Sequence, residues 1–118
     1  MAQVLLVEDE PLVSEVVQSA LEDEGFAVAT ANSDTEAYAR LADEPRSFAA
    51  LVTDINLGCA TTGFEVAERA RALNPDIKVV YMTGLPSNIY AAEVEALMFP
   101  KPFDPWELAR QLKSLTGD

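Results

Sequence analysis

Histidine is absent from this chain, and cysteine occurs only once, as Cys59. Without histidine, the chain has no histidine-based catalytic triad, no imidazole metal ligand and no phosphohistidine of its own. A single cysteine excludes an internal disulfide, which fits a reducing cytoplasm, and we expect a small loop residue there rather than a redox thiol. Any phosphoryl group carried on histidine would have to arrive from another molecule.

Basic residues are also scarce in the first part of the chain. The first 39 residues contain nine acidic side chains and neither Lys nor Arg, and the formal charge of the 118 residues is −12. This balance argues against a secretory or transit segment and against binding of nucleic acid, whose phosphates would be repelled. Since no apolar run approaches the length of a membrane span, we expect a cytoplasmic protein without membrane insertion.

The apolar residues fall into short runs separated by amphipathic segments. The runs rich in strand-forming residues occupy 3–7, 26–30, 49–53, 77–82 and 96–100. Alternation of strand-like and helix-like patterns is typical of a parallel sheet. Because some runs are apolar throughout, as strands buried on both faces are, the pattern predicts an α/β fold with a five-stranded parallel sheet and helices on both faces.

The amphipathic segments carry signals for where helices begin and end. The first segment stops near Gly25, and the last begins with Asp104 as N-cap and Pro105 in its first position. The segment 86–95 has little periodicity and predicts a short or irregular fourth helix. The apolar stripes consist of Leu12, Val13, Val16, Val17, Ala20 and Leu21 in the first helix, and of Leu108, Leu112 and Leu115, expected to be buried, in the last.

Polar side chains of complementary chemistry follow four of the apolar runs. Glu8 and Asp9 come after the first run and Asp54 after the third, while Thr83 and Lys101 come after the fourth and fifth. In open parallel sheets, ligands bind outside the carboxyl ends of the strands. We therefore expect three carboxylates, a hydroxyl and an ammonium group to meet at one edge of the sheet.

Several carboxylates at one site require a cation or a proton. Two of them about 4 Å apart repel by roughly 4 kcal/mol at an effective dielectric constant of about 20. Oxygen ligands favour Mg²⁺. We expect Asp9, Asp54 and the backbone carbonyl of Asn56 to bind the ion directly, and Glu8 to act through a water molecule. By themselves, Glu8, Asp9 and Glu10 also fit the acidic first turn of a helix.

Asp54 is the candidate nucleophile, because a carboxylate can attack a phosphoryl group to form an acyl phosphate. Mg²⁺ and Lys101 would neutralise the charge of the transferred group, and the Thr83 hydroxyl would donate a hydrogen bond to it. Pro100 and Pro102 flank the lysine and restrict its backbone. A strand-end threonine and a surface lysine are common taken singly, so the prediction depends on the whole group.

Together these residues resemble the response-regulator receiver domains of two-component signalling. The resemblance covers essentially the whole chain as a single domain, 1–118. The matching segments are Leu5 to Pro11 for the acidic pair, Asp54 for the phosphoacceptor, Thr83-Gly84 for the switch hydroxyl and its small neighbour, and Lys101 to Phe103 for the lysine motif.

The resemblance implies a flavodoxin-like strand order, 2-1-3-4-5. It also implies Mg²⁺-dependent transfer of a phosphoryl group to Asp54 from a sensor histidine kinase or a histidine phosphotransfer protein, followed by hydrolysis of the acyl phosphate. The output would be altered contact with a protein target that the sequence does not identify.

Three features depart from the usual pattern of this family. The loop 56–63 is longer before its glycine and lacks a Met-Pro pair, and the interval from Thr83 to Lys101 is short. Met98 occupies the position of the usual switch aromatic, and strand alternation should point Phe99 to the opposite face. These departures resemble receivers attached to, or acting alongside, hybrid sensor kinases.

Two other functions stay open from the sequence. One is a phosphorylation-independent interaction module that retains an inherited pocket, which would show no Mg²⁺ binding near Asp9 and Asp54. The other is a phosphatase of the aspartyl-phosphate type, which we rank last because the chain lacks a cap and has Asn56 where a second catalytic aspartate would stand. We expect no conventional enzyme, only self-phosphorylation and autodephosphorylation at Asp54.

Overall fold

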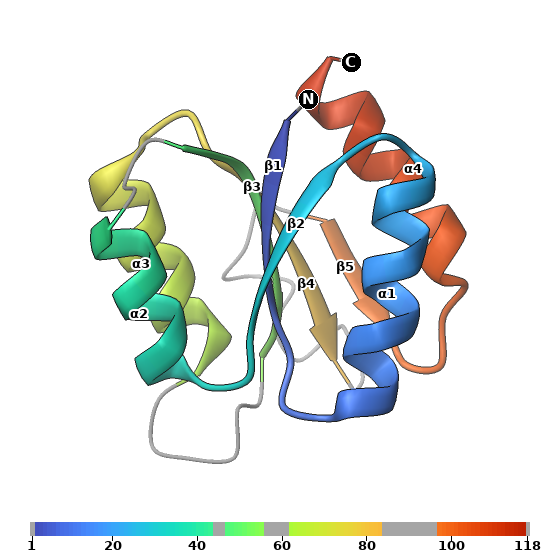
Figure 1. Ribbon diagram of the computed structural model, residues 1–118, viewed down its shortest axis with the longest axis horizontal. Helices are drawn as coiled ribbons and strands as arrows, with labels where there is room; N and C mark the ends of the chain where they lie inside the picture. Colours follow the sequence, from blue (N-terminus) through green and yellow to red (C-terminus); the bar gives the residue numbers. More distant parts are fainter. Residues whose placement is uncertain (1, 44–46, 56–61, 84–96, 118) are drawn as a thin grey trace.

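The computed structural model describes residues 2–43, 47–55, 62–83 and 97–117, and the structural statements below concern these residues. Five parallel strands form one sheet in the order β2-β1-β3-β4-β5 (Figure 1). The strands are β1 (Gln3–Val7), β2 (Ala27–Ala31), β3 (Phe48–Asp54), β4 (Lys78–Thr83) and β5 (Leu97–Pro100). The helices are α1 (Pro11–Asp23), α2 (Asp34–Asp43), α3 (Gly63–Leu73) and α4 (Pro105–Thr116). The predicted fold class and strand order are confirmed.

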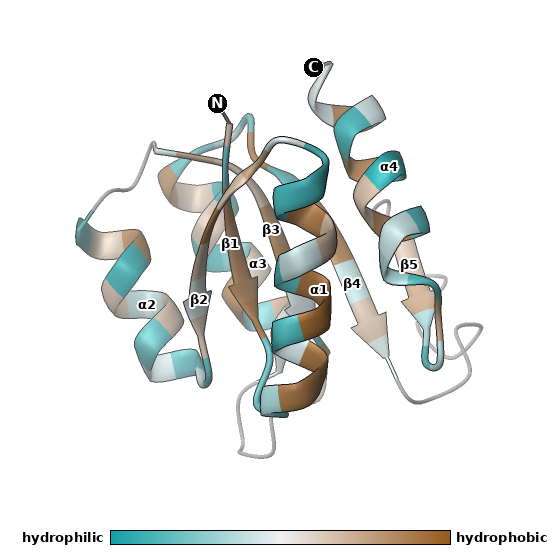
Figure 2. Cartoon of the chain, turned by 45° about the vertical axis from the view of Figure 1, so that its right-hand side comes forward, coloured by the Kyte–Doolittle hydropathy of each residue, from teal (hydrophilic) through white to brown (hydrophobic). Residues whose placement is uncertain are grey.

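Helices cover both faces of the sheet because the strands are apolar on both sides. Leu5 and Val7 of β1 pack on the face covered by α2 and α3, whereas Val4 and Leu6 pack on the face covered by α1 and α4. Figure 2 shows the largely apolar strands between helices that carry both hydrophilic and apolar residues, with apolar residues prominent in the first turns of α1. Within the described ranges, no helix is long and apolar enough to cross a membrane.

Two helix ends follow the signals in the sequence. Gly25, at φ 95°, lies just past the end of α1 in a left-handed conformation that side chains disfavour. Asp104 precedes α4, and its Oδ1 accepts a hydrogen bond from the backbone N–H of Trp106 at 2.9 Å. Pro105 occupies the first position of that helix, as predicted.

Some predicted boundaries and one predicted core residue were wrong. β2 and β4 each begin and end one residue later than the apolar runs suggested, and β3 extends one residue further at each end. Phe26 and Ile77 lie before these strands and are buried. They are apolar because they pack in the core, although they do not pair with a neighbouring strand. Leu115 is 40% exposed, because the last turn of α4 extends past the strands it packs on (Figure 2). The predicted fourth helix, 86–95, lies outside the described residues.

Candidate functional site

The carboxyl ends of four strands bring the predicted polar residues together. In the parallel ladders, Val7 pairs with Thr53, and Thr83 pairs with Pro100, so the strands end nearly level. The residues that close or follow these strands therefore share one edge of the sheet, as the rule for open parallel sheets predicts. They are Glu8, Asp9, Asp54, Thr83 and Lys101.

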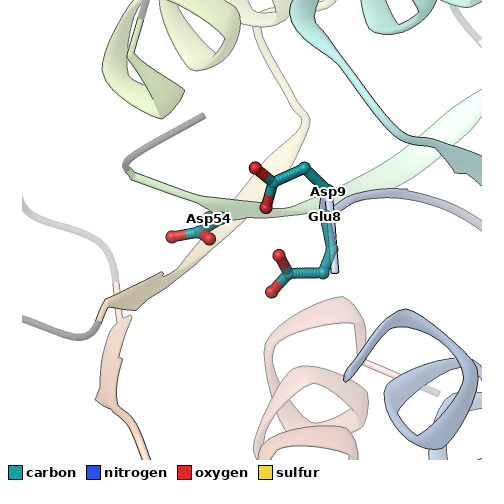
Figure 3. Close-up of side chains that lie close together, drawn as sticks. All are labelled: Glu8, Asp9 and Asp54. Carbon is teal, nitrogen blue, oxygen red and sulfur yellow. The ribbon is translucent and has the colours of Figure 1, made fainter. Parts of the chain in front are cut away.

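Three carboxylates form the centre of this site. Glu8, Asp9 and Asp54 each offer an oxygen atom, and these atoms all lie within 4.8 Å of one another (Figure 3). Glu8 and Asp54 are buried, with 1% and 6% of their surface exposed, whereas Asp9 is exposed. Solvent and ligands thus reach the cluster from the side of Asp9.

Lys101 connects two of these carboxylates. Its Nζ lies 2.8 Å from Oε1 of Glu8 and 3.1 Å from Oδ2 of Asp54, and it donates a hydrogen bond to each. Its backbone N–H donates to the carbonyl oxygen of Thr83 at 2.6 Å, which ties the end of β5 to the end of β4. The peptide bond between Lys101 and Pro102 is cis. The predicted proximity of Lys101 and Asp54 is therefore present in the structure.

Burial and mutual charge shift the pKa values of this group. Burial raises the pKa of Glu8 from 4.5 to about 7, and the charge of Asp54 adds to the rise, against hydrogen bonds from Lys101 and the backbone of Glu10. Burial lowers the pKa of Lys101, but its contacts with Glu8 and Asp54 outweigh this, so the net pKa is raised. The lysine stays charged, and a single ammonium does not neutralise three carboxylates.

The arrangement suits a hard divalent cation. Carboxylate oxygens from Asp9 and Asp54 are the donor type that Mg²⁺ prefers, and the exposed Asp9 leaves room for the water molecules that this ion retains. Both oxygens of Glu8 already accept hydrogen bonds, Oε1 from Lys101 and Oε2 from the N–H of Glu10 at 3.2 Å. This is compatible with the predicted action of Glu8 through a water molecule. Asn56 lies outside the described residues, so its part in the site stays a prediction.

Thr83 closes β4 and is 2% exposed. It lies on the same face of the sheet as Tyr81, while Met82 faces the opposite core. Met98, the Cα partner of Tyr81 on β5, packs against the same core as Tyr81, and Phe99 packs against the other. The predicted alternation of Met98 and Phe99 is confirmed.

One contact within β3 was missed by the sequence analysis. The hydroxyl of Thr53 donates to the backbone oxygen of Asp54 at 3.0 Å, although Thr53 belongs to a run that we interpreted only as a strand. The signal was a buried, polar, β-branched residue directly before the acidic one. The bond restrains the peptide group that carries the candidate nucleophile.

The apolar stripe of α1 is wider than the surface that covers it. Leu12 is 78% exposed and Val16 is 43% exposed, although both belong to the predicted stripe. Together with Pro102 and Phe103 they line a groove of about 490 Å³. Lys101 also lines this groove, so an apolar surface continues directly from the carboxylate site.

Comparisons with known proteins agree with this geometry. The family model for the response regulator receiver domain matches residues 4–113. The response regulator receiver protein CpdR of Brucella abortus (strain 2308) is 31% identical over 98% of this chain and 97% of its own length. The response regulator SaeR of Staphylococcus aureus (strain USA300) is 29% identical over 98% of this chain, which spans 50% of SaeR.

Solved structures with the same fold include two informative relatives. A response regulator receiver protein from Sinorhizobium medicae WSM419 is 28% identical, with a TM-score of 0.90 over 98% of this chain and 94% of its own. The response regulator TrrA from Thermotoga maritima, solved in complex with Mg²⁺-BeF, is 27% identical, with a TM-score of 0.82 over 98% of this chain and 99% of its own. On the family match and the CpdR similarity, this chain belongs to the response regulator receiver domains of two-component signalling.

Proposed function

We propose that this protein accepts a phosphoryl group on Asp54 from a phosphohistidine of another protein, in a reaction that requires Mg²⁺. The supporting observation is the position of the Asp54 carboxylate. It lies 3.1 Å from the Lys101 ammonium and within 4.8 Å of the oxygens of Glu8 and Asp9. A nucleophile, a fixed positive charge and a set of hard oxygen ligands thus share one small site.

The transfer would proceed by attack of an Asp54 oxygen on the phosphorus atom. The bond between phosphorus and the donor's histidine nitrogen breaks, and the nitrogen keeps the electron pair of that bond. Bound Mg²⁺ would supply positive charge to the phosphoryl oxygens. Lys101 is already within hydrogen-bonding reach of Asp54, so its ammonium would meet a second phosphoryl oxygen without a large movement. Thr83, at the end of the neighbouring strand, would donate to a third.

The donor has to be a separate molecule, because the chain contains no histidine. A sensor histidine kinase or a histidine phosphotransfer protein would have to cover the open side of the site to place its histidine against Asp54. The groove lined by Leu12, Val16 and Phe103 lies beside that opening and offers apolar area for such a contact. We expect the donor to bind there.

The output would be a change in protein contacts after phosphorylation. Thr83 and Lys101 are joined through their backbones at 2.6 Å, so movement of Thr83 toward a phosphoryl group would also pull the end of β5. Such a switch is driven by local charge and detected at a distance. Most of the predicted readout surface, 84–99, lies outside the described residues.

Acetyl phosphate provides the direct test. With Mg²⁺, the intact mass of the protein should increase by one phosphoryl group, and a metal chelator should prevent this. The variant Asp54→Asn should not be labelled. Asp43→Asn, which changes an exposed aspartate at the end of α2, should be labelled like the wild type. Label that persisted in Asp54→Asn would contradict the assignment.

The same experiment separates this proposal from the second interpretation of the sequence. A phosphorylation-independent interaction module would show neither label nor binding of Mg²⁺ at the carboxylates. A Mg²⁺ titration of the wild type and of Asp9→Asn therefore completes the test, since the variant should bind the ion more weakly.

A further inference from the structure

We propose that Gly63 is a positioning residue for Asp54: the absence of a side chain at Gly63 allows the start of α3 to press against the backbone of the phosphoacceptor. This inference rests on the proposed function, because it assigns a role in the same reaction to a residue outside the carboxylate site. It is carried by the contacts that hold the Asp54 peptide group in place.

The first helical residue of α3 lies directly against the end of β3. Gly63 is buried, and its backbone N–H donates to the carbonyl oxygen of Ile55 at 2.7 Å. A Cβ atom built on Gly63 would overlap the backbone oxygen of Asp54 and lie 3.0 Å from its carbonyl carbon and from Cα of Ile55. All three atoms belong to the backbone, so no side-chain rotation would relieve the overlap.

Backbone conformation does not require glycine here. Among the described glycines, positive φ angles occur at Gly25 and Gly117 but not at Gly63. Alanine also has a higher helix propensity than glycine. An alanine at the start of α3 would therefore be acceptable to the helix itself, and the requirement for glycine comes from the contact with Asp54.

Two hydrogen bonds also hold the Asp54 peptide group. Its oxygen accepts a hydrogen bond from the Thr53 hydroxyl at 3.0 Å, and the next N–H, that of Ile55, donates to the oxygen of Met82 at 3.0 Å. The carboxylate that extends from this peptide group contacts Lys101 at 3.1 Å. A shift of the backbone would therefore move the nucleophile relative to its positive partner.

The start of α3 has little freedom to retreat from an added methyl group. Phe64 packs on Tyr81 of β4, with ring centroids 4.9 Å apart, and Val66 is fully buried in the core between α3 and the sheet. Normal contact would require a displacement of roughly 1 Å. Because packing restrains both α3 and β3, we expect the backbone of Asp54 to move by part of this displacement. Misplacement of a reacting group by about 1 Å can slow a reaction by roughly 100-fold.

The test compares Gly63→Ala with two controls under conditions in which all proteins are folded. Gly25→Ala makes the same replacement in a strained turn with nothing within 4 Å of the added atom, at the opposite edge of the sheet. Val66→Ala loosens the packing of α3 without an overlap. The readouts are the initial rate of phosphorylation by acetyl phosphate at saturating Mg²⁺, and the Kd for Mg²⁺ alone from calorimetric titration.

Gly63→Ala should be phosphorylated roughly 100-fold more slowly than the wild type and should bind Mg²⁺ more weakly, while both controls keep rates close to the wild type. A wild-type rate and Kd in Gly63→Ala would show that α3 moves away instead, and would overturn the inference. An equal loss in Val66→Ala would also overturn it, because loose packing alone would then explain the effect.

Two further outcomes stay decisive. If the wild type takes no phosphoryl group, the proposed function fails, and the Mg²⁺ affinity of Gly63→Ala relative to the wild type decides the positioning role by itself. If Gly63→Ala does not fold, Thr53→Val provides a second variant, because it removes the hydrogen bond to the same Asp54 backbone oxygen. Phosphorylation of that variant should also be slower than that of the wild type, and a wild-type rate of phosphorylation would count against the inference.

Discussion

Buried polar residues at the amino ends of the strands (the amino edge of the sheet) differ in chemistry from those at the carboxyl ends (the carboxyl edge). At the amino edge, Asn74 is buried and neutral, and its amide donates to the oxygen of Phe48 at 3.0 Å and accepts from the N–H of Asp76 at 3.2 Å. At the carboxyl edge, Glu8 and Asp54 are also buried, but they are acidic side chains that share one lysine. A satisfied neutral group stabilises the fold, whereas clustered charge costs stability unless a ligand compensates it.

Replacing the lysine at each edge by methionine should give the greatest difference between the two edges. Lys101→Met removes the only ammonium that contacts Asp54 among the described residues, and phosphorylation by acetyl phosphate should slow by roughly 100- to 1,000-fold. Lys78→Met, at the exposed start of β4, should leave the rate unchanged. Intact-mass time courses measure both, and equal rates for the two variants would remove the distinction between the edges.

The pH dependence of stability is the next largest effect. In the metal-free protein, folded Glu8 keeps its proton up to about pH 7, whereas an unfolded chain releases it near 4.5. Folding therefore takes up a proton between these values, and the free energy of unfolding should fall as pH rises, by about 3 kcal/mol in total.

Glu8→Gln should abolish this fall, so that the variant is more stable than the wild type at about pH 8 in the presence of a chelator. Urea unfolding at a series of pH values measures it. A wild-type stability that rose across this window would contradict the raised pKa. Added Mg²⁺ should restore part of the lost stability of the wild type.

Asn74→Ala tests the amino edge, with a smaller effect. Loss of the side chain leaves the carbonyl of Phe48 and the N–H of Asp76 without these partners, and the free energy of unfolding should drop by about 2 kcal/mol. The folded variant should still be phosphorylated at the wild-type rate. A slowed reaction would mean that the two edges are coupled rather than independent.

The smallest effect concerns two exposed leucines. Leu12→Ala should slow phosphotransfer from a histidine donor protein by about tenfold, without changing the rate with acetyl phosphate, because only a protein donor would contact the proposed binding groove. Leu115→Ala, on α4 and away from this groove, should change neither rate. A slower reaction with both donors would mean that Leu12 affects the phosphoryl transfer itself rather than the binding of the donor protein.

The convergence of the site was predictable because it follows from topology. Once Asp54, Thr83 and Lys101 are placed after parallel strands, the sheet itself brings them to one edge. Asp104 and Pro105 likewise fixed the start of α4 through local chemistry, without reference to the rest of the chain.

Other features were not predictable because they depend on three-dimensional surroundings. The periodicity of α1 gives the width of its apolar stripe, but which part is covered depends on the neighbours, and Leu12 stays outside. The pKa of Glu8 follows from its depth of burial. The contact between Gly63 and Asp54 joins two backbones, and no pattern of side chains encodes it.

The bridge from Lys101 to Glu8 and Asp54 gives the resting protein an internal counter-ion. Since part of the acidic charge is already balanced from within, we expect the native fold to persist when the surrounding magnesium is depleted. Loss of the ion would then silence the receiver without unfolding it, and resupply would restore its competence without a refolding step.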